Sequence, residues 1–424
     1  MGPSLRPPAL AGLCALAAAA VPAAAQAAAG DVVRRTVADR AVKDAAGVTW
    51  RPGGRLFSGG RTVSANPTPV SGSWRLYQQV RTGVRRIDVP LRRAGRYAVV
   101  LYLAEPGPAG GRRRVFDVRA EGRTVRRGVE VFRTAPQRPL HALFETVVRD
   151  RRLSLRLRAR RSTPAVSAIE VRRLGPASMR PVRELWSDDF EGPAGALPDA
   201  GLWTRDTGAT FAFNEQQVHT DRPENASLDG QGALRIVARR ERYEMEGVTR
   251  DFTSARLVGN RRVPLRRAEV QIRARFPLGV GIWSVLFLYG QGATYPFGGE
   301  VDIAEINGGL PERLHHFLHF GRMTKDGPTD SVLDGSLQLG ERVDARRRTY
   351  VLRSVPGAME VLVDGRRTAS WTRADLYGRR ARWAFDGSFE LLMSLAVGGR
   401  FTGPAGPDTP FPAVMEIDRV LVRG

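Results

Sequence analysis

Short runs of alternating or β-branched residues, separated by glycine and proline, constrain the fold of this chain more than any other feature. Leu153–Arg160 and Val270–Phe276 alternate between apolar and polar residues, and Tyr97–Leu103 is rich in β-branched and aromatic residues. A period of two is typical of a strand with one buried face, and no long stretch carries the 3.6-residue period of a helix. Many short strands joined by turns predict an all-β chain built from β-sandwiches.

The charge of the chain is divided unevenly. Residues 31–175 hold 32 basic and 11 acidic residues, whereas residues 176–424 hold 33 and 32. Two segments with such different balances are most simply two domains, and Pro176–Pro181 has the composition of a joint. We therefore expect domains at residues 31–175 and 186–424, joined by a linker at 176–185.

The first residues have the pattern of a secretory signal peptide. Arg6 precedes an apolar stretch too short to span a bilayer, and Ala25–Ala27 has the A-x-A form of a cleavage site. A lipid anchor is the alternative, because Cys14 is the only cysteine, but Leu13 stands where a lipobox needs a small residue. We expect residues 1–29 to be removed and the protein to be secreted, extracellular or cell-wall associated, without a membrane anchor.

Three carboxylates within six residues mark the stretch Gly298–Gly309. Glu300 and Asp302 are two residues apart and share one face of a regular strand, whereas Glu305 would point to the opposite face. A β-bulge at Ile303–Ala304 would absorb one extra residue and return Glu305 to the face of the other two. The sequence therefore predicts three acids in line on one side of a sheet.

Such a cluster suits retaining glycoside hydrolysis. That reaction needs one carboxylate as nucleophile and a second that is first acid and then base, with their carboxyl groups about 5–5.5 Å apart. A third acid between them can hydrogen-bond the nucleophile, and like-charge coupling raises the pKa of the acid/base toward neutrality. A calcium loop and a solvated acidic edge are the alternatives. Apolar residues between the acids favour a packed strand over either one.

From Trp186 to the C-terminus the chain closely resembles glycoside hydrolase family 16, in particular its laminarinase-like branch. Glu300–Glu305 fits the family signature E-x-D-x-x-E in its bulged form. Other matching stretches follow in the family's order: Trp186–Phe190, Asn214–Glu215, Glu224–Ala226, Phe252–Leu257, Gly279–Trp283, Leu395–Gly399 and Met415–Val420. So many ordered motifs make a chance match a poor explanation.

The resemblance implies a curved, concanavalin-like jelly-roll sandwich with an open cleft. It implies that Glu300 is the nucleophile, Glu305 the acid/base and Asp302 their helper. Cleavage would be endo-acting, with net retention, at β-linked glucans or galactans. We expect β-1,3-glucan as the substrate. A β-galactan of the agarase or carrageenase type, transglycosylation, and a glycan-binding protein without turnover are the alternatives.

Further residues are candidates for binding the polysaccharide. Asn214, Arg256, Tyr295 and His319 fall where laminarinase-like relatives contact glycan, and Trp283 is a candidate residue of the cleft. Planar polar side chains fix sugar hydroxyls, and aromatic faces stack on sugar rings. The alternatives are a structural ion pair for Arg256, a hydrogen-bonded sheet histidine for His319 and a core aromatic for Trp283. Near Trp283 and Tyr295, residues that are usually tryptophan in the family are replaced by others. The resemblance therefore specifies the retaining mechanism more closely than the identity of the sugar.

The resemblance implies no cofactor for the reaction. It implies only a structural calcium ion on the outer face, with Asp418 as the candidate ligand beside backbone oxygens such as that of Gly232. One carboxylate with carbonyl groups makes a weak oxygen site for calcium.

Residues 31–175 resemble a malectin-like carbohydrate-binding module, more weakly than the match of the second domain. The matching stretches are Leu76–Gln78, Gly95–Val99, Leu101–Glu105, Arg114–Val118 and Ala168–Val171. The resemblance implies a second β-sandwich that binds glycan through loops at one end. A sandwich that serves as a spacer without a ligand is the alternative.

Arginine supplies all but two of the 66 basic residues. In Leu153–Arg160, the leucines and Ala159 would face the core. Arg156, Arg158 and Arg160 would then form a basic stripe toward solvent. Because guanidinium groups match carboxylate, sulfate and phosphate, we expect this domain to hold the protein on an anionic wall or matrix polymer. No nucleic acid is expected as a partner, since no recognition motif is present.

Overall fold

The computed structural model describes residues 32–65, 72–106, 114–131, 140–178, 181–209, 213–378 and 380–424. Within these ranges the regular elements are strands and short 3-10 helices, so the all-β prediction is confirmed. No helix in them has both the length and the apolar character needed to cross a bilayer. The predicted signal peptide at residues 1–29 lies outside the described residues.

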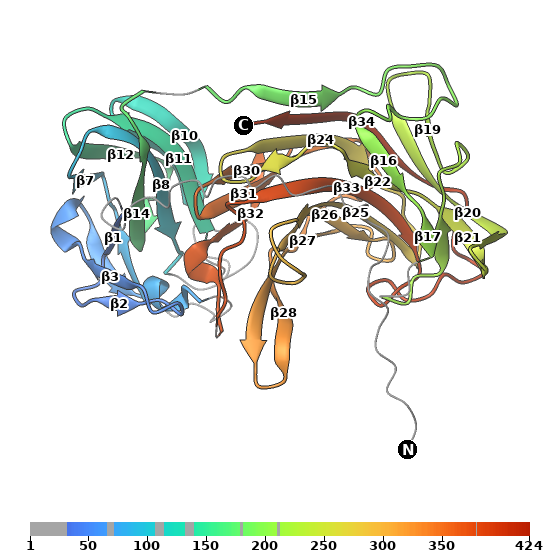
Figure 1. The fold of residues 1–424 in the computed structure, drawn as a ribbon. Coiled ribbons are helices and arrows are strands. Elements are labelled where there is room, and N and C mark those ends of the chain that lie inside the picture. Colours follow the sequence, from blue (N-terminus) through green and yellow to red (C-terminus); the bar gives the residue numbers. More distant parts are fainter. Residues whose placement is uncertain are drawn as a thin grey trace.

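Two sheets face each other in the N-terminal part of the chain (Figure 1). The first contains, in spatial order, β11 (Leu140–Val148), β8 (Gly95–Leu103), β14 (Ala168–Gly175), β1 (Val32–Thr36), β3 (Thr49–Pro52) and β2 (Val42–Lys43). The second contains β10 (Arg123–Glu130), β9 (Val115–Ala120), β12 (Arg152–Arg161), β7 (Arg86–Pro90) and β4 (Phe57–Ser58). A smaller sheet contains β13 (Ala165–Val166), β6 (Gln79–Thr82) and β5 (Arg61–Ser64), and the 3-10 helices are η2 (Gly54–Leu56) and η3 (Trp74–Tyr77).

Strand alternation explains how these two sheets pack. The three leucines of β12 are buried in the core between the sheets, while Arg156, Arg158 and Arg160 are exposed as predicted. Each fully buried leucine contributes about 1.5–3 kcal/mol to folding. Ala159 lies opposite the buried Phe116 of β9, on the side of the core as predicted, but it is exposed and adds nothing to the core.

Two larger, curved sheets form the C-terminal part (Figure 1). The first contains β17 (Gly208–Ala209), β18 (Gln217–His219), β21 (Val248–Ser254), β20 (Leu234–Met245), β34 (Ala413–Arg423), β24 (Glu269–Arg275), β30 (Arg348–Val355), β31 (Ala358–Val363) and β32 (Arg366–Thr372), with β15 (Glu184–Asp188) on β34 and β19 (Ala226–Leu228) on β20. The second contains β16 (Trp203–Asp206), β22 (Arg256–Gly259), β33 (Ser388–Val397), β25 (Ile282–Gly290), β26 (Glu300–Asn307), β27 (Arg313–Thr324) and β28 (Gly327–Asp334), with β23 (Val263–Pro264) on β33 and β29 (Leu337–Gln338) on β27. The 3-10 helix η4 (Arg373–Asp375) follows β32.

The two curved sheets enclose one large core. Along β25, buried residues alternate without a break with half-buried ones. Ile282, Leu286 and Leu288 belong to the core together with Ile272 of β24 and Leu352 of β30. The other face of β25 and its neighbours β26 and β27 lies on the concave side of the curve (Figure 1).

The two cores draw on separate stretches of the chain. The N-terminal core takes its residues from Val37 to Val171, and the large core takes its residues from Trp186 to Val422. This separation agrees with domains at 31–175 and 186–424, whose boundaries, like the linker at 176–185, stay a prediction.

A third buried cluster joins the two parts of the molecule. It combines Trp50, Tyr77 and Tyr102 of the N-terminal part with Val355 and Ala358 at the turn between β30 and β31. One face of the first N-terminal sheet therefore packs in the core of its own sandwich. Part of its other face packs against the C-terminal part.

Candidate active site

The strand β26 contains the predicted bulge. Successive residues of β25 lie opposite Ala304 and Asp302, so Ile303 has no partner on that strand. The pairing of β26 with β27 is irregular between Asp302 and Glu305 in the same way. The prediction of an extra residue at 303–304 is confirmed.

The bulge separates β26 into an apolar face and an acidic face. Its apolar residues from Val301 to Ile306 are fully buried in the large core. Glu300, Asp302 and Glu305 lie on the other face, where Asp302 is 2% and Glu305 is 6% exposed and Glu300 is half-buried. Three carboxylates are thus gathered in one largely water-excluded place.

Each acid lies in a row across three strands. Written in the order β25, β26, β27, the rows are Tyr289–Glu300–His319, Phe287–Asp302–Phe317 and Val285–Glu305–His315. Residues directly opposite each other in a sheet share a face, so each acid has a ring beside it on β27. On β25, Glu300 and Asp302 also lie beside rings, whereas Glu305 lies beside Val285. Aromatic side chains, two histidines and one valine therefore surround the acids on this face.

Burial and mutual repulsion raise the proton affinity of two of the acids. Burial, then the neighbouring charge of Asp302, raise the pKa of Glu300 to about 8. Burial and Asp302 also raise the pKa of Glu305 well above its usual range, against a smaller lowering by the hydrogen bond from Trp283. Because the groups interact strongly, they titrate as one set rather than as independent residues.

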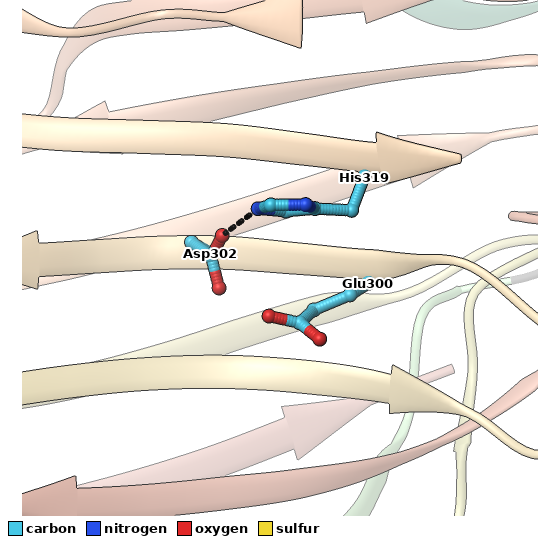
Figure 2. A group of neighbouring side chains, drawn as sticks. All are labelled: Glu300, Asp302 and His319. Carbon is cyan, nitrogen blue, oxygen red and sulfur yellow. Dashed lines mark ion pairs between the residues drawn. The ribbon is translucent and has the colours of Figure 1, made fainter. Parts of the chain in front are cut away.

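His319 provides positive charge beside the acids. Its Nε2 lies 3.3 Å from an Asp302 carboxylate oxygen, the ion pair drawn in Figure 2, and its Nδ1 lies 2.7 Å from Asp330. Burial alone would lower the pKa of His319, but the hydrogen bonds and charges of the two aspartates raise it to about 11. The Tyr295 hydroxyl donates to the same Asp330 oxygen at 2.7 Å, and its ring stacks on Tyr289. The predicted residues His319 and Tyr295 are therefore brought to the acids.

Trp283 is also part of the site. Its indole Nε1 donates a hydrogen bond of 2.8 Å to Oε1 of Glu305. The indole ring contacts Phe401, with ring centres 5.4 Å apart, and Phe213, with ring centres 6.1 Å apart. Phe213 is 49% exposed, so an apolar surface continues outward from Glu305.

Arg256 and Asn214 lie further from the acids. Arg256 is in the same cross-strand row as Glu305 but three strands away, roughly 14 Å at the usual strand spacing. It makes ion pairs with Asp206 at 3.2 Å and Glu215 at 3.9 Å. These contacts agree with the alternative that Arg256 forms a structural ion pair. Asn214 is exposed, has a left-handed backbone with φ of 61°, and follows Phe213 next to Trp283.

Ligand atoms of Glu300, Asp302 and His319 lie within 4.8 Å of one another, close enough to surround a metal ion (Figure 2). A histidine binds a metal only when its imidazole is neutral. Here hydrogen bonds to two aspartates overcome the effect of burial and raise the pKa of His319 to about 11. The arrangement therefore fits a charged histidine better than a metal ligand.

The predicted calcium ligand has other partners. Asp418 makes ion pairs with Arg273 at 3.1 Å and Arg347 at 3.7 Å. Both guanidinium groups contact Oδ2 of Asp418, whereas its buried Oδ1 has no hydrogen-bond partner among the described residues. Calcium at Asp418 therefore stays a prediction, and no step of the reaction is assigned to a metal.

Sequence reasoning missed several residues of the site. Asp330 comes from β28, and Tyr289, Phe317 and Phe401 come from β25, β27 and the segment after β33. The signal available was the alternation of rings along β25 and β27. It shows which residues share a face only once the pairing of these strands with β26 is known.

Known proteins match both parts of the chain. Residues 37–172 match the Malectin domain family. A β-glucanase of Rhodothermus marinus is 34% identical over 253 residues, which cover 56% of this chain and 84% of that protein. A glucan endo-1,3-β-glucosidase of Cryptopygus antarcticus is 31% identical over 234 residues, which cover 51% of this chain and 81% of that protein. The solved structure of the laminarinase from Rhodothermus marinus matches with a TM-score of 0.50 and 30% identity, over 58% of this chain and 98% of that chain.

A pair of curved sheets with three carboxylates in line on one strand, two of them buried, together with these relatives, defines a glycoside hydrolase. The chain belongs to glycoside hydrolase family 16, in its laminarinase-like branch, and its N-terminal part contains a malectin-like domain.

Proposed function

We propose that this protein is an endo-acting hydrolase of β-1,3-glucan that retains the anomeric configuration. The bulged strand β26, which places Glu300, Asp302 and Glu305 on one buried face, is the observation that carries the proposal. Relatives named β-glucanase and glucan endo-1,3-β-glucosidase support the substrate class.

In the first step, a Glu300 carboxylate oxygen attacks the anomeric carbon of a bound sugar. Glu305 gives its proton to the glycosidic oxygen, the bond between that oxygen and the anomeric carbon breaks, and the leaving part of the polymer departs as an alcohol. A covalent ester between the sugar and Glu300 remains. The raised pKa of Glu305 suits the donor of this proton.

In the second step, Glu305 is the base. A water molecule gives a proton to the Glu305 carboxylate, and the water oxygen attacks the anomeric carbon. The ester bond breaks, which restores the Glu300 carboxylate. Two displacements at the same carbon give net retention.

Trp283 and His319 determine where protons are held on Glu305 and Glu300 during the two steps. Because Trp283 donates to Oε1 of Glu305, that oxygen is the acceptor and the transferable proton sits on Oε2. The positive charge of His319 lowers the pKa of Glu300, which favours the ionised nucleophile. Asp302 lies between them and couples the two acids.

The anomer of the first product tests the mechanism. Laminarin hydrolysed in an NMR tube should release β-configured reducing ends before mutarotation, and Glu300→Ala should release none. Appearance of the α-anomer first would contradict double displacement. Activity of Glu300→Ala near the wild-type level would contradict the assignment of the nucleophile.

A panel of polymers tests the substrate. Laminarin should be cleaved faster than mixed-linkage glucan, agarose and carrageenan, with oligosaccharides of several lengths appearing early, as endo action requires. Preference for agarose or carrageenan would instead favour a β-galactanase. Longer products at high oligosaccharide concentration would favour transglycosylation, and binding without any product would favour a glycan-binding protein.

We propose further that Asn214, Arg256, Trp283, Tyr295 and His319 contact the polymer along the face of the acids. For Trp283, the half-buried ring against Phe213 supports this role. For Arg256, its position in the row of Glu305 supports it. Alanine at Trp283 should raise KM for laminarin and lower kcat, because the same side chain holds Glu305.

We also propose secretion, supported by the pattern of residues 1–29, and attachment to an anionic wall or matrix polymer through the N-terminal domain. The exposed arginines Arg156, Arg158 and Arg160 support the attachment. Retention on an anionic resin that falls steeply with salt would be the expected behaviour, and salt-independent retention would contradict it.

A further inference from the structure

A cavity of about 380 Å³ lies in the N-terminal sandwich, between residues of its two sheets. One wall comes from β1 and β3, and the other comes from the segment that follows β7. Four arginines line it, together with Leu91 and Tyr97: Arg34, Arg35, Arg51 and Arg92. The nucleophile and acid/base proposed above lie on β26, in the other part of the chain.

The strand pairing explains why two of these arginines enter the cavity. Residues two apart on β1 share a face, so Arg35 lies in line with Val33 and with Val37, which is buried in the sandwich core. Arg35 is paired directly with Arg51 on the parallel strand β3. Both side chains therefore leave the sheet on the same side, toward the second sheet.

Such a pair is unfavourable by itself, because like charges directly opposite each other in a sheet repel. Within the described ranges, Arg34 has a carboxylate partner in Glu170 at 2.7 Å, whereas no carboxylate pairs with Arg35, Arg51 or Arg92. Arg35 donates only to the backbone oxygen of Arg34. Arg51 and Arg92 are exposed and Arg35 is half-buried, so their charges face the open cavity, where a bound anion would compensate them.

The rest of the lining is apolar or hydroxyl-bearing. Leu91 and Tyr97 are nearly buried and form an apolar side, and the Tyr97 hydroxyl donates to the backbone oxygen of Arg93 at 2.5 Å. Thr49 adds an exposed hydroxyl at the rim. A ligand that fits must carry negative charge on one side and a compact ring with apolar C–H edges on the other. The volume is within the range of pockets that hold small ligands.

We propose that this cavity binds a sugar residue that carries an oxyanion, either a carboxylate or a sulfate, within an acidic polysaccharide. The inference rests on the anionic-polymer attachment proposed above and gives it a site. Guanidinium groups suit both oxyanions, because their paired N–H groups match two oxygens of one group.

Binding of the full-length protein to three polymers, measured at one fixed ionic strength, tests the site. Dextran sulfate provides sulfate, polygalacturonate provides carboxylate, and unmodified dextran provides the uncharged control. Arg51→Gln should raise the dissociation constant for the bound polymer about tenfold, and Arg35→Ala combined with Arg51→Ala should raise it further. Arg123→Ala combined with Arg127→Ala removes the same charge from exposed positions of β10 in the same domain and should change the constant less than threefold.

The polymer that loses affinity in the Arg51→Gln variant identifies the oxyanion. Equal losses in the cavity variants and in the β10 control, or binding by neither charged polymer, would overturn the proposed site. If the charged polymers bind equally well to all variants, attachment by the domain stands and the cavity is excluded. Thermal unfolding verifies that each variant folds, and laminarin hydrolysis should stay unchanged, which separates this test from that of the active site.

Discussion

The charges of Glu300, Asp302, Glu305 and His319 have to be considered together, because Asp302 and His319 each alter the proton affinity of both Glu300 and Glu305. Without a cation, burial and the charge of Asp302 would keep Glu300 and Glu305 protonated to high pH and leave no nucleophile. The imidazolium of His319 counters this effect by its contact with Asp302. Sequence reasoning assigned His319 to substrate binding, whereas its contacts make it first a charge partner of the acids.

Replacement of His319 by glutamine should move the pH profile of kcat/KM toward higher pH. The positive imidazolium lowers the pKa of both Glu300 and Glu305, so its loss raises both. We expect the acid limb, which reports ionisation of Glu300 in the free enzyme, to rise by about one pH unit or more. Initial rates on laminarin between pH 4 and 10 measure the shift.

Asp330→Asn should shift the pH profile of kcat/KM in the opposite direction to His319→Gln. The charge of Asp330 raises the pKa of Glu300, so its removal should move the acid limb to lower pH, provided that Asp302 keeps His319 charged. An unchanged profile in both variants, or a shift of His319→Gln to lower pH, would contradict this account of the site.

Glu300→Gln should make the protein more stable at pH 8 but not at pH 5. Burial and Asp302 raise the pKa of Glu300 from 4.5 to about 8 in the folded state, so between these values the folded protein binds more protons than the unfolded chain. Stability therefore falls as pH rises through this window, and the amide removes that loss. We expect a gain in Tm of several degrees at pH 8, corresponding to a few kcal/mol, together with loss of hydrolysis.

The exposed residue Glu312 provides the control for that measurement. Glu312→Gln should leave Tm unchanged at both pH values, because no buried charge is removed. A Tm of Glu300→Gln below that of the wild type at pH 8 would mean that the carboxylate stabilises the fold, and the proposed repulsion would then be wrong.

The structure of strand β26 could be predicted from the sequence to a large extent. Acids at 300, 302 and 305 cannot share one face of a regular strand, so the spacing alone required the bulge that the structure contains. The all-β fold was likewise evident from alternation. Both predictions rest on periodicity within one segment, which needs no knowledge of other segments.

Contacts between elements could not be predicted in the same way. Asp330 reaches His319 because β28 pairs with β27, and Phe401 reaches Trp283 through a segment that follows β33. Register between distant strands decides these contacts, and no local pattern encodes it.

The contact between β27 and the segment before β26 can be tested at Gly321. A Cβ atom there would lie 2.4 Å from the ring of Phe297, two residues after Tyr295. Gly321→Ala should displace this segment, weaken the bond from Tyr295 to Asp330, and destabilise the protein by about 1–3 kcal/mol. Thermal unfolding and KM for laminarin measure the two effects, and KM should rise.

Gly292, in the same segment, is the matched control. A Cβ atom at Gly292 would meet nothing within 4 Å, so Gly292→Ala should leave both Tm and KM unchanged. Equal behaviour of the two variants would show that the segment adjusts freely and that the proposed contact with β27 does not hold Tyr295 in place.

The contact between the two parts of the molecule involves more than apolar packing. His141 Nε2 lies 2.8 Å from the Tyr77 hydroxyl and 3.6 Å from Asp375, which belongs to the C-terminal part. Arg126 of β10 forms an ion pair with Glu360 of β31. Interfaces between domains are often small and polar enough to allow relative motion. Here buried polar groups on each side depend on the other, which favours unfolding as a single unit.

The pair of Arg126 and Glu360 tests this coupling. Glu360 is 2% exposed, so Arg126→Ala leaves a buried carboxylate without its cation and should destabilise the protein by about 2–4 kcal/mol. Arg126→Met combined with Glu360→Leu removes both charges and should recover part of that loss. Arg123→Ala, on the exposed start of β10, should have no effect.

Calorimetry should show one transition in the wild type. Two separate transitions there, or equal Tm values for Arg126→Ala and Arg123→Ala, would mean that the parts fold independently, because the buried ion pair would then contribute nothing to holding them together.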